Sequence, residues 1–249
     1  MAAAVKLHRH VGRRHASRFL AEGPNLVEGA LRRDLVIEVF VTEDALIRFE
    51  SMLGDVPVHL VTERAAKALS DTVTPVGLVA VCEAPSTSLS GVLADRPKLV
   101  TVAAGISEPG NAGTLIRIAE AMGADAVVLA GHSVDPYNGK CLRASAGSIF
   151  AIPVVAEPDA TQAVSALSDG GLRVLATTLD GDLSLDDADL SGPTAWLFGP
   201  ESHGLPAELT EMAADRIRIP MAGGAESLNV AAAAAICLYQ SAKALRGSI

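Results

Sequence analysis

Aromatic residues are scarce in this sequence: Phe, Tyr and Trp make up 3% of 249 residues, although 49% are hydrophobic. A core must therefore be built from Ala, Val, Leu and Ile, and base stacking on aromatic rings is not the main device for holding a nucleic acid. Apolar runs of membrane-spanning length are also missing, and no apolar segment of a signal peptide follows the basic start. We therefore expect a soluble, cytoplasmic protein with no membrane partner.

Cysteine and nucleotide-binding motifs are sparse too. The three cysteines, Cys82, Cys141 and Cys237, are scattered without metal-ligand spacing, which predicts reduced thiols and no metal site. The turn after the apolar run 99–104 lacks Gly-x-Gly-x-x-Gly, and Gly-Lys-Ser/Thr occurs nowhere. Nicotinamide chemistry and nucleotide hydrolysis both lose support.

The net charge of −9 is unevenly distributed. The first 33 residues carry seven Lys or Arg against two Glu, a local charge of +5, which leaves −14 on the remainder. A basic patch on an acidic protein suits phosphate contacts, whereas the same run could equally be a solvated, frayed terminus. The residues we assign to phosphate contacts are Arg9, Arg13, Arg14 and Arg18.

Alternating strand-like and helix-like segments predict an α/β fold in two domains. A small α/β domain over residues 1–83, with a basic arm, is followed by a linker at 84–97, rich in small polar residues and proline, and a larger domain at 98–249. Predicted strands are 36–41, 58–61, 77–82, 99–104, 126–130, 152–155, 173–178, 194–198 and 216–219. Predicted helices are 25–31, 45–53, 63–69, 112–122, 160–167 and 227–245.

Three loops combine glycine with polar side chains, at residues 108–117, 197–205 and 219–230. Each follows an apolar run typical of a buried strand. Because ligands of open α/β sheets bind at the carboxyl ends of the strands, we expect the three loops to converge there.

These loops closely resemble, in order and spacing, the three motifs of the SpoU branch of the SPOUT RNA 2′-O-ribose methyltransferases. The motifs read Asn-Ala-Gly-Thr-Leu-Ile-Arg from Asn111, Gly-Pro-Glu-Ser-His-Gly-Leu from Gly199, and Ile219-Pro220 through Ser-Leu-Asn-Val from Ser227. Residues 135–148 resemble the segment between the first two motifs, and residues 18–27 the opening of an N-terminal RNA-recognition domain. Within the family, the sequence looks most like the thiostrepton-resistance group that acts on 23S ribosomal RNA.

The resemblance implies a catalytic α/β domain with a deep trefoil knot, S-adenosylmethionine as cofactor, and a homodimer that completes the active site. It assigns catalysis to Arg117, with Asn111 beside it. Arginine remains protonated in proteins, so we expect Arg117 to stabilise the developing alkoxide and grip the adjacent phosphate, while the final proton acceptor stays unassigned. Taken alone, Arg117 would instead be placed in an ion pair on an exposed helix face.

The other motif residues receive roles in the same way. Glu201 either braces its loop by accepting N–H bonds or lies near the sulfonium charge, and Ser227 and Asn229 bind substrate or the catalytic arginine, with helix capping as the alternative. His203 receives no role. The cofactor is assigned to Gly199, Gly204, Ile219, Leu228 and Thr177, the last with Thr178 at the adenine end. Arg143 is assigned to RNA, or to the partner subunit's site.

The expected reaction is methylation of a ribose 2′-hydroxyl, with 23S ribosomal RNA as the leading substrate and transfer RNA as the alternative. Two other classes stay open. One is a catalytically silent RNA-binding protein of the same fold, against which the intact motif residues argue. The other is a small-molecule enzyme or binding protein on a generic α/β sheet, against which the basic N-terminus and the separate leading domain argue.

Overall fold

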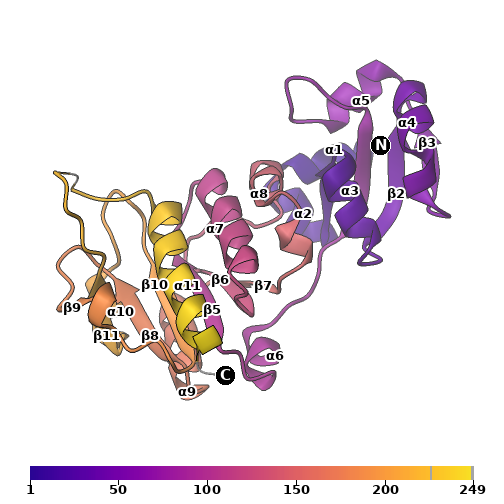
Figure 1. The fold of residues 1–249 in the computed structure, drawn as a ribbon. Coiled ribbons are helices and arrows are strands. Elements are labelled where there is room, and N and C mark those ends of the chain that lie inside the picture. The colour runs from indigo at the N-terminus through magenta and orange to yellow at the C-terminus, as the bar shows by residue number, and fades with distance from the viewer. Residues whose placement is uncertain (225, 248–249) are drawn as a thin grey trace. The chain divides into compact units, whose positions relative to one another are not determined.

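The structure is a computed structural model that describes residues 1–224 and 226–247. It divides into two compact units, Met1–Ser86 with Tyr137–Ala151 and Thr87–Pro136 with Ile152–Ile249 (Figure 1). Among the described residues, no helix has the length and apolar character needed to cross a membrane.

The first unit, which we call the N-terminal unit, is built on a four-stranded sheet of order β1-β4-β2-β3. Strand β4 runs antiparallel to β1 and β2, and β3 pairs in parallel with β2. Five of the six residues of β4 are buried, which its Leu-Val-Ala-Val-Cys run explains. The strands are β1 (Arg18–Glu22), β2 (Val36–Val41), β3 (Val58–Leu60) and β4 (Leu78–Glu83). The helices are α1 (Ala2–Val5), η1 (Lys6–His8), α2 (His10–Ala16), α3 (Pro24–Leu31), α4 (Glu43–Leu53), α5 (Glu63–Leu69), α8 (Gly139–Ser145) and η2 (Ser148–Phe150).

The second unit, which we call the C-terminal unit, is built on a seven-stranded parallel sheet of order β7-β6-β5-β10-β8-β11-β9. Its strands are β5 (Leu99–Ala104), β6 (Ala126–Ala130), β7 (Val154–Glu157), β8 (Arg173–Thr177), β9 (Leu183–Ser184), β10 (Thr194–Phe198) and β11 (Asp215–Arg218). The helices are α6 (Leu89–Ala94), α7 (Pro109–Ala121), α9 (Ala160–Asp169), η3 (Leu185–Asp187), α10 (Ala207–Met212) and α11 (Val230–Gly247). Every residue of β5, β6 and β10 is buried, as expected for parallel strands covered on both faces.

Side chains alternate between two faces of this sheet. Val100, Val102 and Leu197 point into a cluster with residues of α6, α9 and α10. On the other face, the buried Trp196 Nε1 donates to Ser241 Oγ of α11 at 2.8 Å, which satisfies the one polar group of that ring. Alanine-rich α11 and α7 pack against each other beside it.

Each strand and helix expected from the sequence is present, with ends shifted by three residues at most. Several elements were not foreseen. The basic arm expected to be frayed or RNA-contacting forms α1, η1 and α2, and residues 18–22 form β1. Within the expected linker, residues 89–94 form α6, because Leu89 and Val92 join the sheet core.

The three cysteines are free and buried. Burial raises the pKa of the Cys82 thiol to about 12, so it stays protonated and unreactive at neutral pH. The structure describes no cluster of His, Cys, Asp or Glu suited to a metal ion in residues 1–224 and 226–247.

Candidate active site

A cleft of about 650 Å³ opens at the carboxyl ends of β8, β10 and β11. Its lining comes from the end of β8, from residues 198–205 after β10, and from the segment 216–230 that follows β11 into α11. Two of the three motif loops therefore form one pocket, at the sheet edge where the sequence placed them. The volume is typical of a small-molecule site.

The loop after β10 is folded tightly upon itself. A Cβ atom on Gly199 would lie 2.7 Å from the backbone carbon of Gly204 and 2.7 Å from the nitrogen of Leu205. Gly204 itself has a φ of +66°, in the left-handed region that favours glycine. Because the clash is with backbone, a side chain at position 199 would displace the loop that forms one wall of the cleft.

Gly199→Ala is therefore expected to weaken cofactor binding about tenfold or more while leaving the protein folded, since the strain falls on a surface loop. Isothermal titration with S-adenosylmethionine measures the affinity, and thermal unfolding tests the fold. Gly192→Ala is the matched control, because nothing lies within 4 Å of a Cβ at that position. Unchanged affinity in Gly199→Ala would show that this wall does not hold the ligand.

Glu201 joins the three motif loops. Its Oε1 accepts hydrogen bonds from Asn111 Nδ2 at 3.0 Å, from Asn229 Nδ2 at 2.6 Å and from the Val230 N–H at 3.1 Å. Asn229 Nδ2 also lies 3.3 Å from Asn111 Oδ1. One carboxylate oxygen thus fixes side chains from the first and third motifs and the start of α11.

Asn229 has a second task at the same place. Its Oδ1 accepts from the backbone N–H groups of Ala231 and Ala232 at 3.0 and 3.4 Å, which caps α11. Capping and participation in the network therefore coexist. Ser227 is exposed and lines the cleft, and α11 begins beyond it at Val230, so Ser227 is not the residue that caps this helix.

Arg117 projects from α7 into solvent. It makes no hydrogen bond or ion pair with any residue that the structure describes, so the alternative of a surface ion pair finds no partner there. Neither Arg117 nor Asn111 lines the cleft, although Asn111 is hydrogen-bonded to Glu201, which does line it. The exposed Arg117 guanidinium is therefore available to a substrate.

The five residues assigned to the cofactor, Gly199, Gly204, Ile219, Leu228 and Thr177, all line the cleft. Thr177 uses its hydroxyl internally, as a donor to the Leu197 carbonyl at 3.0 Å. The neighbouring Thr178 hydroxyl is buried and has no partner within the described chain. Thr178 is therefore the better candidate for a hydrogen bond to a ligand.

Arg216 and Asp182 flank the cleft and were missed in the sequence analysis. Arg216 Nε and Nη2 donate to Asp182 Oδ2 at 3.0 and 2.7 Å, and this bonding raises the pKa of Arg216. The two residues lie 34 positions apart, and no local pattern in the sequence connects them.

The arginines assigned to RNA fall into two groups. Arg9, Arg14 and Arg18 are exposed. Arg13 is only 6% exposed and its Nη1 donates to the carbonyls of Leu7 and His8, so it holds η1 and α2 together and is not available to phosphates. Arg143 is engaged with Asp71 inside the N-terminal unit. Arg13 and Arg143 thus both have partners inside the N-terminal unit, unlike the exposed Arg9, Arg14 and Arg18.

A parallel α/β sheet with a small-molecule cleft at its carboxyl edge, joined to a separate α/β unit with exposed arginines, defines a ligand-dependent enzyme with a second domain for its substrate. Comparison with protein families makes this specific. Residues 98–239 match the SpoU rRNA Methylase family, and residues 2–80 match the MRM3-like substrate binding domain. The chain belongs to the SpoU rRNA methylase family, which confirms the resemblance of the three motifs.

Similar proteins include three bacterial methyltransferases. The chain is 37% identical to the 23S rRNA (guanosine(2553)-2′-O)-methyltransferase RlmP of Bacillus subtilis over 235 residues, 94% of this chain and 92% of that protein. The structure of the SpoU methyltransferase AviRb from Streptomyces viridochromogenes in complex with AdoMet superposes with a TM-score of 0.87 at 28% identity, covering 97% of this chain and 95% of that one. The AdoMet-bound rRNA methyltransferase of Sinorhizobium meliloti gives 0.85 at 29% identity, covering 97% and 93%.

Proposed function

We propose that this enzyme methylates a ribose 2′-hydroxyl of large-subunit ribosomal RNA, in the cytoplasm, with S-adenosylmethionine as methyl donor. The observation that carries the proposal is the Glu201 network, which brings Asn111 and Asn229 together beside a cofactor-sized cleft. Arg117 lies on the same helix, α7, as Asn111. The names of the similar enzymes, which refer to 2′-O-methylation of 23S ribosomal RNA, support the same substrate.

The cleft fits S-adenosylmethionine. The buried, unpartnered Thr178 hydroxyl offers a hydrogen bond to the polar edge of an adenine, and backbone groups at Ile219 and Leu228 lie along the same wall. The tight turn at Gly199 lets main chain approach the ligand closely. When bound, the cofactor supplies an electrophilic methyl group on its sulfonium.

The residues of the chain position and activate the hydroxyl. Arg117 donates to the ribose oxygen as negative charge develops on it and holds the neighbouring phosphate, which lowers the barrier by electrostatic stabilisation. Glu201 keeps Asn111 and Asn229 fixed, so that the three loops keep one geometry during the reaction. Ser227, exposed in the cleft, is free to bind the substrate.

The same proposal includes a homodimer and a knotted catalytic domain. Helix α11 exposes Ile236 and Tyr239, at 39% and 52%, on one face, and a second copy would cover this apolar surface and complete the site near Arg117. The knot is proposed from membership of the SpoU rRNA Methylase family, whose model matches residues 98–239.

The proposal assigns RNA recognition to residues 1–83 and catalysis to residues 98–249. Residues 84–97 connect these two domains. The exposed Arg9, Arg14 and Arg18 supply phosphate contacts, which position RNA without reading its sequence.

The test is transfer of labelled methyl to unmodified 23S ribosomal RNA and, in parallel, to a transfer RNA pool, with the product mapped by resistance to alkaline cleavage. We expect one protected site in 23S RNA. A protected site in transfer RNA alone would show that transfer RNA, and not ribosomal RNA, is the substrate. Cofactor binding without any methyl transfer would support a silent RNA-binding protein.

Thr178→Val is expected to weaken S-adenosylmethionine binding about 3- to 10-fold without loss of thermal stability, since the hydroxyl makes no bond in the free protein. Thr177→Val is the matched control. It removes the bond to the Leu197 carbonyl and is expected to lower stability by about 1 kcal/mol. Calorimetric titration and thermal unfolding distinguish the two, and equal affinity of Thr178→Val and wild type would remove Thr178 from the site.

A further inference from the structure

The N-terminal unit is assembled from two separate stretches of chain. Residues Tyr137–Ala151 leave the parallel sheet after β6 and return to it at β7, but they cluster with Met1–Ser86. We call them the inserted segment; it contains α8 and η2. The polypeptide therefore passes between the units at 86–87, 136–137 and 151–152, where a simple linker would give one passage.

The inserted segment supplies part of the hydrophobic core of this unit. Phe19 of β1 is fully buried, and its ring stacks on Tyr137 and Phe150 with centroids 4.7 and 6.1 Å away. A Cβ on Gly29 of α3 would come within 2.7 Å of the Phe150 ring. Three of the protein's few aromatic rings therefore pack together and hold this segment in place.

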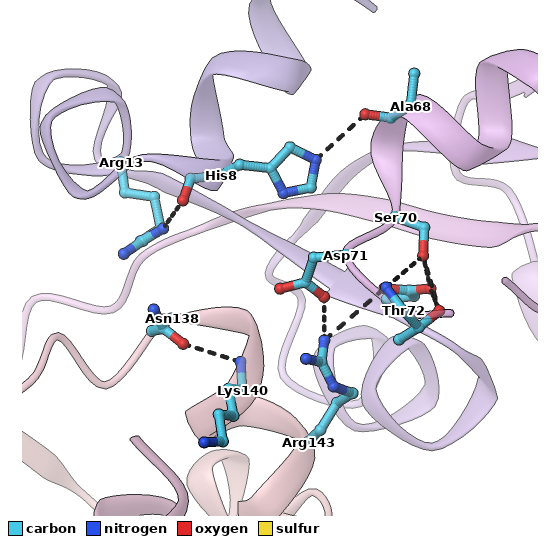
Figure 2. Close-up of polar contacts among 10 residues, drawn as sticks. His8, Arg13, Ala68, Ser70, Asp71, Thr72, Asn138, Lys140 and Arg143 are labelled. Atoms are coloured by element: carbon cyan, nitrogen blue, oxygen red, sulfur yellow. Dashed lines mark hydrogen bonds and ion pairs between the residues drawn. The ribbon is translucent and has the colours of Figure 1, made fainter. Parts of the chain in front are cut away.

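A polar cluster fixes the same segment. Arg143 of α8 forms an ion pair with Asp71, shown in Figure 2, and its Nη1 lies 4.0 Å from Glu22 Oε2. A Cβ on Gly139 would lie 2.5 Å from Asp71 Oδ2, so only glycine lets this carboxylate come so close to α8. We call Arg143, Glu22 and Asp71 the Arg143 clamp.

Glu22 is itself held in place to receive the cation. Its Oε1 accepts from Thr72 Oγ1 at 2.7 Å and from Ser70 Oγ, and Ser70 Oγ accepts from the Thr72 N–H at 3.0 Å. The Glu22 side chain is only 10% exposed. A carboxylate buried to this extent is costly without a cation, so loss of Arg143 would leave an uncompensated charge.

The space around the clamp is too small for a nucleotide. The cavity lined by Glu22, Asp71, Tyr137 and Arg143 has a volume of about 40 Å³, roughly the share of one water molecule. Arg143 is 35% exposed and directs its charge to the two carboxylates. The ion pairs with Asp71 and Glu22 therefore point to an internal role for Arg143.

The chain just before the inserted segment is hydrogen-bonded to β5, to β6 and to the loop between β5 and α7. Ser133 Oγ lies 2.9 Å from the Ala103 carbonyl and 2.7 Å from the Ala130 carbonyl, and it accepts from the Ile106 N–H at 3.1 Å. Ile106 stands in the short loop that leads into α7, the helix that bears Asn111 and Arg117. Within the C-terminal unit, the chain just before the inserted segment is therefore bonded to the residue that precedes the first motif loop by two positions.

We propose that Arg143 is a positioning residue for methyl transfer: the clamp holds the inserted segment in the N-terminal unit and so keeps this unit in the conformation that binds RNA. The inference rests on the proposed function for its RNA substrate. It assigns Arg143 a role inside the protein, in place of the RNA contact expected from the sequence.

The experiment compares Arg143→Gln, Glu22→Gln and Asp71→Asn in the full-length protein. Glu28→Gln is the matched control, because Glu28 is paired with Arg32 on the exposed face of α3 in the same unit. Hydrogen–deuterium exchange without RNA measures the protection of residues 137–151. Methylation kinetics measure KM for RNA and kcat, and titration measures cofactor affinity.

We expect all three clamp variants to lose protection in residues 137–151 about tenfold and to raise KM for RNA by a similar factor, with cofactor affinity unchanged and Glu28→Gln like wild type. The Arg143→Gln/Asp71→Asn double variant should be no worse than either single variant, because both break one contact.

Two results would overturn the proposal. One is unchanged protection in the three clamp variants. The other is weaker RNA binding in Arg143→Gln alone, with Asp71→Asn binding as tightly as wild type or more tightly, which identifies an RNA ligand. Failure of the proposed function is recognised separately: wild type would methylate no RNA, while the exchange measurement would still report on the clamp.

Discussion

Arg117→Ala is expected to reduce kcat for RNA methylation about 10²- to 10³-fold, which is the typical effect of removing a donor that stabilises developing oxyanion charge. The side chain is exposed and has no bond to another described residue, so its removal should leave the melting temperature and cofactor affinity unchanged. Single-turnover transfer of labelled methyl to RNA measures the loss.

Arg117→Lys provides the matched comparison. Lysine keeps the positive charge but lacks the planar fork that contacts an oxygen and a phosphate together, so we expect partial activity between that of wild type and Arg117→Ala. Wild-type turnover in Arg117→Ala would remove Arg117 from the reaction. A fall in cofactor affinity equal to the fall in rate would assign it to binding.

Glu201→Ala is expected to lower kcat about 10²-fold through disorder of the three loops, although Glu201 need not touch the ribose. The change leaves the Asn111 and Asn229 amides and the Val230 N–H without the acceptor they share. Because the network is largely exposed, water replaces part of the bonding, and we expect a stability loss of only about 1 kcal/mol. Exchange at residues 226–232 should increase.

Glu201→Gln separates geometry from charge in this network. Glutamine retains a carbonyl oxygen for the same donors, so activity close to wild type is the expected result if Glu201 acts by bracing the loops. A loss as large as in Glu201→Ala would show that the negative charge itself is needed. Glu211→Ala, at an exposed position on α10, controls for the loss of a surface carboxylate.

The alternation of apolar strands and amphipathic helices made most of the fold predictable. Strands β5 and β6 are largely apolar runs, each preceded by a charged residue and followed by glycine, and their bounds coincide with the prediction. Elements held by contacts distant in sequence were not predictable. Strand β1 has a charge at each end and is buried by pairing with β4 and by the stacking of Phe19 on Tyr137 and Phe150. Helix α8 contains glycine, lysine and arginine in seven residues.

The site divides in the same way. Motif spacing indicated which residues meet, and Asn111, Glu201 and Asn229 do meet in one network. Which of their hydrogen-bonding atoms already have a partner depends on the tertiary structure. Adjacent threonines look alike in the sequence, yet Thr177 is bonded to a neighbouring strand and Thr178 is not. Arg143 reaches Asp71 across 72 positions, a distance over which no local pattern operates.

The divided construction of the N-terminal unit has a consequence during synthesis on the ribosome. Domains of larger proteins ordinarily fold one after another as they emerge, the first before the second. Here Phe19 and Glu22 cannot form their native contacts until Tyr137, Arg143 and Phe150 have been synthesised. Those three residues follow β5, α7 and β6 in the chain. The nascent unit of residues 1–86 therefore remains incomplete, with an apolar surface open, until strands β5 and β6 of the parallel sheet have also been made.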